Sequence, residues 1–240
     1  MRCRLADGSA GIAAAVSDVA HHRRDTELTK VKFAKAVGAL LLLFAGAYGP
    51  AFLTVGLLRL RPVQAVPIII VISLTAAIFL IYVVSRRAGG FAQFGFQFCH
   101  YRYIAAAIVL GVPIGWAVTI LVSHLSSGPP PPEMSFRPWM MLLYFVVGAA
   151  TQEEVIFRGL LQTTVARQFP AKLSFFGTSL SYSAIIVALL FGLIHMEVNP
   201  ITAAAAFVLG LLTGELRHRS GSLLPAILVH AVFNAFAATL

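Results

Sequence analysis

The chain has 240 residues, of which 59% are hydrophobic and only 11% are charged. Soluble globular domains carry about a quarter charged residues, so this composition excludes a water-soluble domain and indicates a protein surrounded by lipid. The formal net charge of +9 does not indicate nucleic-acid binding, because the basic residues are scattered between apolar runs and not gathered on one segment.

The chain begins with a polar segment and continues as one membrane domain. Residues 1–32 lack the apolar core of a secretory signal, and we predict a disordered cytoplasmic tail there. Residues 33–240 contain no repeat and no second domain, so we predict a single all-α, polytopic transmembrane bundle. It consists of seven apolar runs, most of them near the roughly 20 residues that span a bilayer, at 36–58, 63–84, 103–123, 138–160, 181–196, 200–216 and 222–239.

The breaks between the runs are rich in charge, glycine or proline. The segment 128–133 is too proline-rich for a helix and is expected to be a stiff, extended loop. The fifth and sixth runs are only about 16 residues long. They are expected to form a hairpin that stops below the outer surface.

The distribution of Lys and Arg predicts the orientation. Seven spans with the N-terminus inside and the C-terminus outside leave only Arg59, Arg61 and Arg137 outside, which agrees with the positive-inside rule. A six- or eight-span count would lose this asymmetry. The inside residues are Arg2, Arg4, Arg23, Arg24, Lys30, Lys32, Lys35, Arg86, Arg87, Arg102, Arg167, Lys172, Arg217 and Arg219.

Two adjacent acids lie deep inside the fourth run. Glu153 and Glu154 are about fifteen residues from its start, where an unrelieved charge costs between about 3 and more than 10 kcal/mol. Glu154 and Arg158 are spaced i, i+4, so they share a helix face and are expected to form a neutralised ion pair. Glu153 points about 100° away, and apolar Phe157 follows it at i+4. Glu153 is therefore expected to be the unpaired carboxylate.

Two later runs supply partners for these acids. His195 ends the fifth run, with Phe191 one turn earlier on the same face, and His230 and Asn234 are spaced i, i+4 in the seventh run. Their depths agree with that of Glu153 if the fifth helix is short or starts late. A carboxylate and an imidazole can deprotonate a water for attack on a carbonyl, while a second histidine and an amide can donate to the oxyanion. The set predicts a hydrolytic site.

These residues resemble the three motifs of the CAAX-protease and bacteriocin-processing (CPBP, or Abi) family of intramembrane endopeptidases. The motifs EExxxR, FxxxH and Hxxx(N/B) are present as EEVIFR at 153–158, FGLIH at 191–195 and HAVFN at 230–234. The similarity covers 136–240. One such motif would be weak, but three in order on three helices are a specific signal.

The resemblance implies an endopeptidase that cuts a peptide bond of a membrane-associated substrate, as in CAAX or bacteriocin and sorting-signal processing. It implies that Glu153 and His195 activate the water, that His230 and Asn234 stabilise the oxyanion, and that the Glu154–Arg158 pair supports them. Members of this family have been described both as zinc metalloproteases and as metal-free glutamic proteases. The expected partners are a peptide or protein substrate and the lipid bilayer, and the expected location is the cytoplasmic membrane of a bacterium.

Two alternatives stay open at this point. Zinc would use Glu153, His195 and His230 as ligands, but HExxH is absent and the histidines lie 35 residues apart. The metal-free scheme, with no cofactor, is preferred because the asparagine and arginine suit it. A proton-coupled transporter or a non-catalytic scaffold could use the same Glu/Arg/His cluster as a relay, although no inverted halves are evident.

Overall fold

The computed structural model describes residues 9–86, 89–125, 136–170, 172–175 and 178–238, with side chains from residue 34 onward. It divides into two compact units, Met1–Ala39 and Leu40–Leu240, and the second contains all the residues of the predicted site. The predicted proline-rich loop at 128–133 lies outside the described residues.

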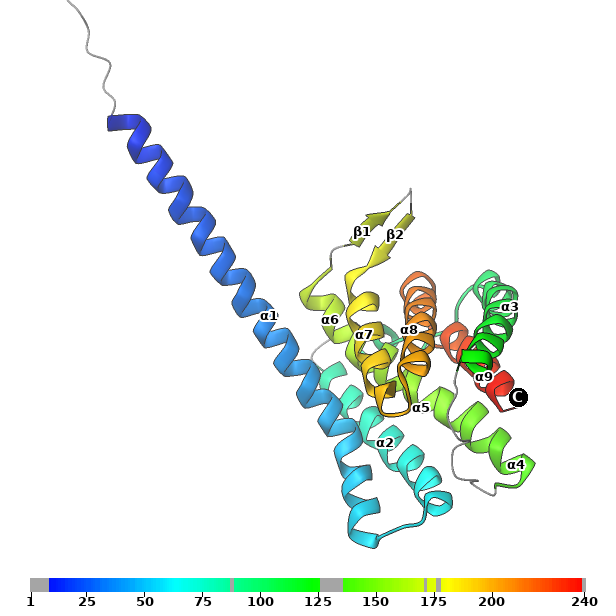
Figure 1. Ribbon diagram of the computed structural model, residues 1–240. Coiled ribbons are helices and arrows are strands. Elements are labelled where there is room, and N and C mark those ends of the chain that lie inside the picture. Colours follow the sequence, from blue (N-terminus) through cyan, green and yellow to red (C-terminus); the bar gives the residue numbers. More distant parts are fainter. Residues whose placement is uncertain (1–8, 87–88, 126–135, 171, 176–177, 239–240) are drawn as a thin grey trace, which may run out of the picture. The chain divides into compact units, whose positions relative to one another are not determined.

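The elements are almost all helical (Figure 1). Of the η elements, η1 and η4 are 3-10 helices, whereas η2 and η3 are π-helical. In chain order the elements are α1 (Ser9–Leu58), α2 (Pro62–Ser85), η1 (Phe91–Phe94), α3 (Tyr101–Leu125), α4 (Pro138–Met141), η2 (Leu142–Ala149), α5 (Ala150–Glu154), η3 (Val155–Leu161), α6 (Gln162–Gln168), β1 (Lys172–Phe175), β2 (Thr178–Ser181), α7 (Tyr182–Ile194), η4 (His195–Glu197), α8 (Pro200–Ser220) and α9 (Leu224–Ala237).

The first unit consists of the N-terminal part of α1. The backbone is helical from Ser9 onward, within the segment for which the sequence predicts a disordered tail. The alanine-rich stretch at 10–15 explains the local preference, because alanine has the highest helix propensity.

Five helices in the described part of the chain are long and apolar enough to cross a membrane. The other two apolar runs form the shorter helices α7 and α9, of 13 and 14 residues. The fifth run is short as predicted, but the sixth forms α8, which has 21 residues and is longer than expected. The chain is a multi-pass membrane protein by its helix composition, and the orientation stays a prediction. The five candidate spans are Ala34–Leu58, Pro62–Ser85, Tyr101–Leu125, Pro138–Gln168 and Pro200–Ser220.

Local sequence signals explain where the helices around the site begin and end. Helix α7 begins where the Ser181 hydroxyl accepts a hydrogen bond from the Ala184 N–H, and α8 begins where the Asn199 side chain accepts one from Thr202 N–H. Helix α8 ends at Gly221, whose positive φ of 71° suits a glycine. Helix α7 has only 13 residues, and a short helix is the condition under which His195 can reach the depth of Glu153.

Helices α7 and α8 approach each other through small residues. A Cβ added at Gly210 would lie 3.1 Å from Ala188, and one added at Gly214 would lie 3.0 Å from the Cβ of Ala184. Small residues of this kind let membrane helices pack backbone against backbone. The contact brings the polar middle of α8 close to Arg158, whose Nη2 lies 3.4 Å from the added Cβ position at Gly210.

A short hairpin departs from the all-α prediction. Strands β1 and β2 pair antiparallel, with Leu173 opposite Leu180. Leu173, Ser174 and Phe175 alternate apolar and hydroxyl side chains, and phenylalanine and threonine are residue types that favour strands. The hairpin is anchored to α8, because the Glu215 carboxylate accepts the Ser181 N–H at 2.6 Å.

Candidate active site

The site is built on one long helix that changes its winding twice. The span Pro138–Gln168 contains the π-helical segments η2 and η3, and the α-helical segment α5 between them carries both glutamates. Short π-helical turns are rare and often occur at functional sites. This helix packs against α2 and α9, and α9 brings His230 and Asn234 beside it.

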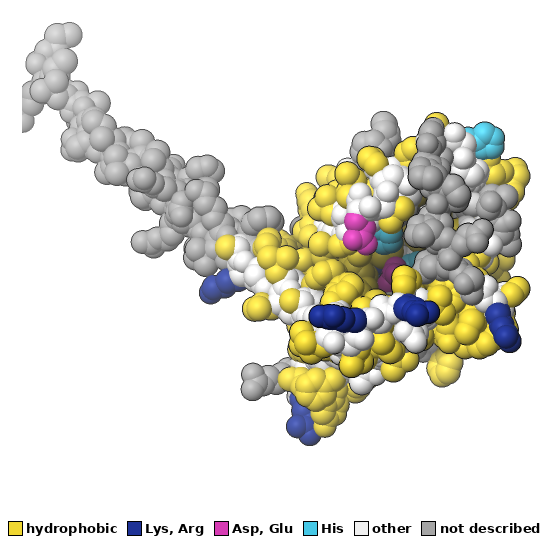
Figure 2. Space-filling view, turned by 60° about the horizontal axis from the view of Figure 1, so that its bottom comes forward, with side chains coloured by type: hydrophobic (Ala, Val, Ile, Leu, Met, Phe, Trp, Pro, Cys, Tyr) yellow, Lys and Arg dark blue, Asp and Glu magenta, His cyan; other side chains and the backbone are white. Residues whose placement is uncertain are grey.

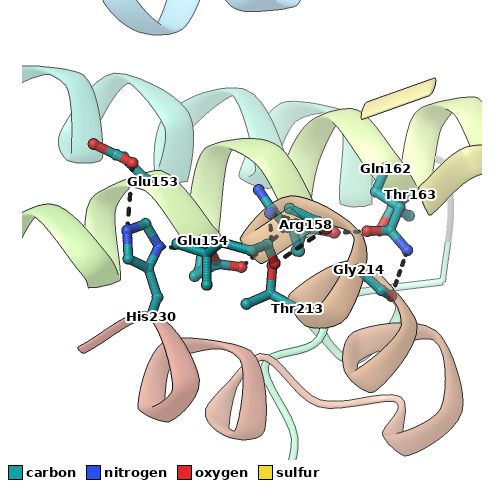
Figure 3. A network of polar contacts seen from close by, with 10 residues as sticks. Glu153, Glu154, Arg158, Gln162, Thr163, Thr213, Gly214 and His230 are labelled. Atoms are coloured by element: carbon teal, nitrogen blue, oxygen red, sulfur yellow. Dashed lines mark hydrogen bonds and ion pairs between the residues drawn. The ribbon is translucent and has the colours of Figure 1, made fainter. Parts of the chain in front are cut away.

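Glu154 and Arg158 form the buried foundation of the site. Arg158 Nε lies 3.2 Å from Glu154 Oε2, and neither side chain is exposed. The ion pair expected from the i, i+4 spacing is therefore present. The guanidinium continues to α8, where Arg158 Nη2 donates to Thr213 Oγ1 at 2.6 Å and to the Gly210 carbonyl at 3.1 Å (Figure 3). The arginine thus joins the glutamate helix to α8.

His230 lies between the two glutamates (Figure 3). Its Nδ1 is 2.8 Å from Glu154 Oε1, and its Nε2 is 3.7 Å from Glu153 Oε2. The carboxylate of Glu154 fixes the orientation of the imidazole ring, as acidic partners of functional histidines commonly do. The sequence did not predict this bridging position, and Glu153 has a nearby imidazole where it was expected to be unpaired.

His195 is oriented by the backbone of its own helix. Its Nδ1 lies 2.7 Å from the Phe191 carbonyl, which can only accept a hydrogen bond, so Nδ1 carries the proton. In the neutral ring Nε2 is then left with its lone pair, as a base requires. The Phe191 ring packs edge-on against His195 at 4.7 Å and against His230 at 5.8 Å. Phe191 therefore holds both histidines.

Asn234 makes a contact that its sequence position did not predict. Its Nδ2 donates to the Phe145 carbonyl at 2.8 Å, within the π-helical segment η2. One of the two amide hydrogens is thereby engaged, and one remains for another acceptor. Asn234 thus ties α9 to the helix that carries the glutamates.

Four of the six predicted residues line one pocket of about 350 Å³: Glu153, His195, His230 and Asn234. Figure 2 shows acidic and histidine side chains inside a hollow of a face that is otherwise mostly hydrophobic. The Glu153 side chain is 21% exposed, whereas that of Glu154 is fully buried, so only Glu153 of the two acids can contact a substrate or a water. The short α7 brings His195 to this pocket.

A second, apolar pocket of about 170 Å³ adjoins the first. The two share His195, His230, Asn234 and Ala237. The remaining wall of the apolar pocket comes from α3, α7, α8 and α9, with Val118, Val122, Phe191, Leu209 and Phe233 among its residues. A hydrophobic group can therefore lie directly beside the polar cluster.

The two acids differ in how their charges are compensated. The fully buried Glu154 contacts the guanidinium of Arg158, whereas Glu153 has only the imidazole of His230 near it, at 3.7 Å. The carboxylate without a cationic partner is therefore the one that lines the pocket.

Sequence reasoning missed Thr213 and Tyr48. Thr213 is a fully buried polar residue within the apolar α8, and that isolation was the available signal. Tyr48, on α1 within the second unit, is buried, and its ring lies 6.4 Å from that of Phe157, which is in the chain between the two glutamates and Arg158. Nothing in the sequence connects Tyr48 to the site, because a tyrosine in an apolar run is common.

The donors suggested for zinc do not form a three-ligand site. Among the described residues, no group of three His, Cys, Asp or Glu side chains is placed to hold a metal ion. Both nitrogens of His230 lie near carboxylates and Nδ1 of His195 lies near a carbonyl, so His195 Nε2 is the one ring nitrogen of the two histidines without a near acceptor among the described residues. The residues as arranged do not fit a zinc site, and no step of the chemistry below uses a metal.

The comparisons with known proteins identify the family of the C-terminal part of the chain. Residues 135–236 match the family described as type II CAAX prenyl endopeptidase Rce1-like, and the match contains all three motifs predicted from the sequence. No curated protein and no solved structure matches the chain. Over residues 135–236 the chain therefore carries a domain of the Rce1-like type II CAAX prenyl endopeptidase family, which is a family of peptidases.

Proposed function

We propose that the protein is an intramembrane endopeptidase whose reactive pair is Glu153 and His195. The observation that carries this proposal is that these two residues, with His230 and Asn234, line one pocket in front of the buried Glu154–Arg158 pair. The family implies a peptide substrate. The alternative of a proton relay explains the buried charges, but it does not explain the pocket that adjoins an apolar one.

The chemistry follows from the placement of the groups. A water held between Glu153 and His195 Nε2 loses a proton to one of them as its oxygen bonds to the carbonyl carbon. The oxygen of the carbonyl becomes negative and accepts hydrogen bonds from protonated His230 Nε2 and from the free amide hydrogen of Asn234. The C–N bond then breaks, and the abstracted proton moves to the leaving amine. Glu154 keeps His230 oriented throughout.

The adjoining apolar pocket supports a hydrophobic substrate. Its walls can hold an apolar side chain, or part of a lipid chain attached to the substrate, beside the cleaved bond. This fits a CAAX-type or sorting-signal-like peptide at the membrane of a bacterium. The proposal predicts that substituting Val118 or Leu209 changes which peptides are cut more than it changes the fold.

The test uses two variants and a matched control. Glu153→Gln and His195→Ala are expected to reduce cleavage by at least about 100-fold, because each removes a group that activates the water. Glu197→Gln, at an exposed acid just after His195, is the control and is expected to cut normally. The substrate is found as the membrane peptides that accumulate uncut in cells carrying Glu153→Gln. Cleavage that persists in both variants would contradict the proposal.

A further inference from the structure

A second polar pocket lies away from the catalytic one. It has a volume of about 270 Å³ and shares no lining residue with the pocket of Glu153. Its walls come from η1, the helix end η3–α6, the start of α7 and the end of α8. The residues that matter below are Gln93, Arg158, Gln162, Arg167, Arg217 and His218.

The pocket is strongly basic. Three arginines and His218 line it, and no carboxylate is among its lining residues. Gln93 holds two of the arginines: its side-chain oxygen accepts from Arg167 Nη2 at 2.9 Å and its carbonyl accepts from Arg217 Nη2 at 2.8 Å. The nearby Glu215 is engaged elsewhere, with the Ser181 N–H and with Arg219. Arg158 is paired with Glu154 behind the wall, whereas Arg167 and Arg217 have no acidic partner among the residues that line the pocket.

Buried donors in this wall are left without partners. Arg217 Nε and Arg158 Nη1 have no hydrogen-bond partner among the described residues, although the two residues are only 9% and 1% exposed. Buried polar atoms are nearly always hydrogen-bonded, and an unsatisfied charged donor is more costly than a neutral one. Arg158 uses its other nitrogens for Glu154 and Thr213, so Nη1 is the atom left for the pocket. Both atoms are enclosed, and Arg217 Nε lies against Gly95, so an anion in the pocket satisfies these donors when the two guanidinium groups turn toward it.

Gln162 adds an acceptor to these donors. Its Nε2 donates to the Gly214 carbonyl at 2.9 Å, which leaves its Oε1 buried and without a partner (Figure 3). An anion cannot satisfy an acceptor, but a hydroxyl can. The pocket therefore suits a ligand that carries a negative group and a hydroxyl a short distance apart.

The surroundings of the pocket are those of a membrane surface. Arg167 and Arg217 lie in the last turns of α6 and α8, near the ends of two candidate spans. Phe91 and Phe96, on either side of Gln93 in the chain, are exposed apolar residues. Basic pockets between membrane helices at this depth bind lipid headgroups. Exposed aromatic side chains next to the pocket can contact the acyl chains of such a lipid.

We propose that this pocket binds a glycerophosphate group, with its phosphate on Arg167, Arg217 and Arg158 and a hydroxyl on Gln162 Oε1. A phospholipid such as phosphatidylglycerol and free glycerol 3-phosphate both present this chemistry. The position at the ends of the spans favours the lipid. Binding requires neither Glu153 nor His195, so it can be tested separately from the proposed proteolysis, although Arg158 belongs to both sites.

The experiment measures which lipids stay bound to the purified full-length protein. Native mass spectrometry in nanodiscs with equal amounts of phosphatidylglycerol, phosphatidylethanolamine and phosphatidylcholine reports lipid retained by the wild type. Arg167→Gln/Arg217→Gln is expected to lower phosphatidylglycerol retention by about tenfold or more, since each lost arginine removes a charge-assisted hydrogen bond. The matched control is Arg86→Gln/Arg102→Gln, two arginines that lie over tyrosine rings outside the pocket.

A third variant covers the case in which the double variant does not fold. Ala166→Phe fills the pocket without changing a charge, and it is also expected to release the lipid. Competition by soluble glycerol 3-phosphate, with no preference for phosphatidylglycerol, would assign the same site to the soluble ligand. Equal retention of phosphatidylglycerol in the double variant and its control, or full retention in Ala166→Phe, with no binding of glycerol 3-phosphate, would overturn the proposal.

Discussion

The substitution Glu154→Gln tests whether Glu154 stabilises the site and leaves the reaction itself to Glu153. The substitution keeps the shape of the side chain and removes its charge. In the wild type, Glu154 Oε1 lies 2.8 Å from His230 Nδ1 and Oε2 lies 3.2 Å from Arg158 Nε, with all of these groups buried. After the change Arg158 is a buried cation that keeps hydrogen bonds to Thr213 and Gly210 but has lost its carboxylate.

The magnitude follows from this burial. Breaking a buried ion pair by removing one partner costs about 3–5 kcal/mol of unfolding free energy, because the other charge stays desolvated. For a chain of this size that corresponds to a fall in the unfolding temperature of about 6–20 °C. Glu153→Gln is expected to cost less than about 1 kcal/mol, since its nearest charged partner is 3.7 Å away and its side chain is partly exposed.

The assay compares thermal unfolding of the purified variants with their cleavage activity. Glu154→Gln is expected to unfold at a lower temperature, whereas Glu153→Gln is expected to unfold like the wild type but to be inactive. Glu154→Leu/Arg158→Met, which removes both charges, is expected to recover most of the stability. If Glu153→Gln lowered the unfolding temperature as much as Glu154→Gln, the division of the two acids into a reactive and a supporting residue would be wrong.

Three further outcomes are expected. Thr213→Val removes an acceptor of Arg158 and should lower the unfolding free energy by about 1–3 kcal/mol. The control is Thr164→Val, because the Thr164 hydroxyl donates to the Leu160 carbonyl of the same long helix. Tyr48→Ala removes a buried ring that packs against Phe157 and should lower the unfolding free energy by about 3 kcal/mol or more; an unchanged unfolding temperature would separate Tyr48 from the support of the site. Asn234→Leu frees the Phe145 carbonyl and should speed amide hydrogen exchange in η2, which would stay slow if that bond did not hold the segment.

The sequence predicted the parts of the site that depend on spacing within one helix. The Glu154–Arg158 pair follows from the i, i+4 geometry of a helix, and the pair is present. The family resemblance is confirmed over residues 135–236. The shortness of the fifth apolar run was also visible, and it brings His195 to the pocket of Glu153. These features depend on local geometry, which sequence patterns encode well.

The parts that depend on packing between helices could not be predicted. The place of His230 between both acids depends on how α9 rotates against α5, and helix periodicity does not contain that rotation. The hydrogen bond from Asn234 to the Phe145 carbonyl could not be predicted, because a sequence motif describes side chains and not the backbone groups that they contact. The basic pocket contains Gln93, Arg167 and Arg217. These residues lie far apart in the sequence, so the sequence does not indicate that they are close in space. The hairpin was missed because its strands have only four residues each.

The two π-helical segments on either side of α5 have a consequence for changes in chain length. A π-helical turn holds one more residue than an α-helical turn, so a one-residue deletion within Leu142–Ala149 can be absorbed by converting a wide turn into an ordinary one. The glutamates would then still point toward His230, and the part of the helix before the deletion would also keep its orientation. The same deletion inside Ala150–Glu154 would rotate everything on one side by about 100° and part Glu153 from His230. One-residue deletions are therefore expected to be tolerated beside the glutamates and not among them.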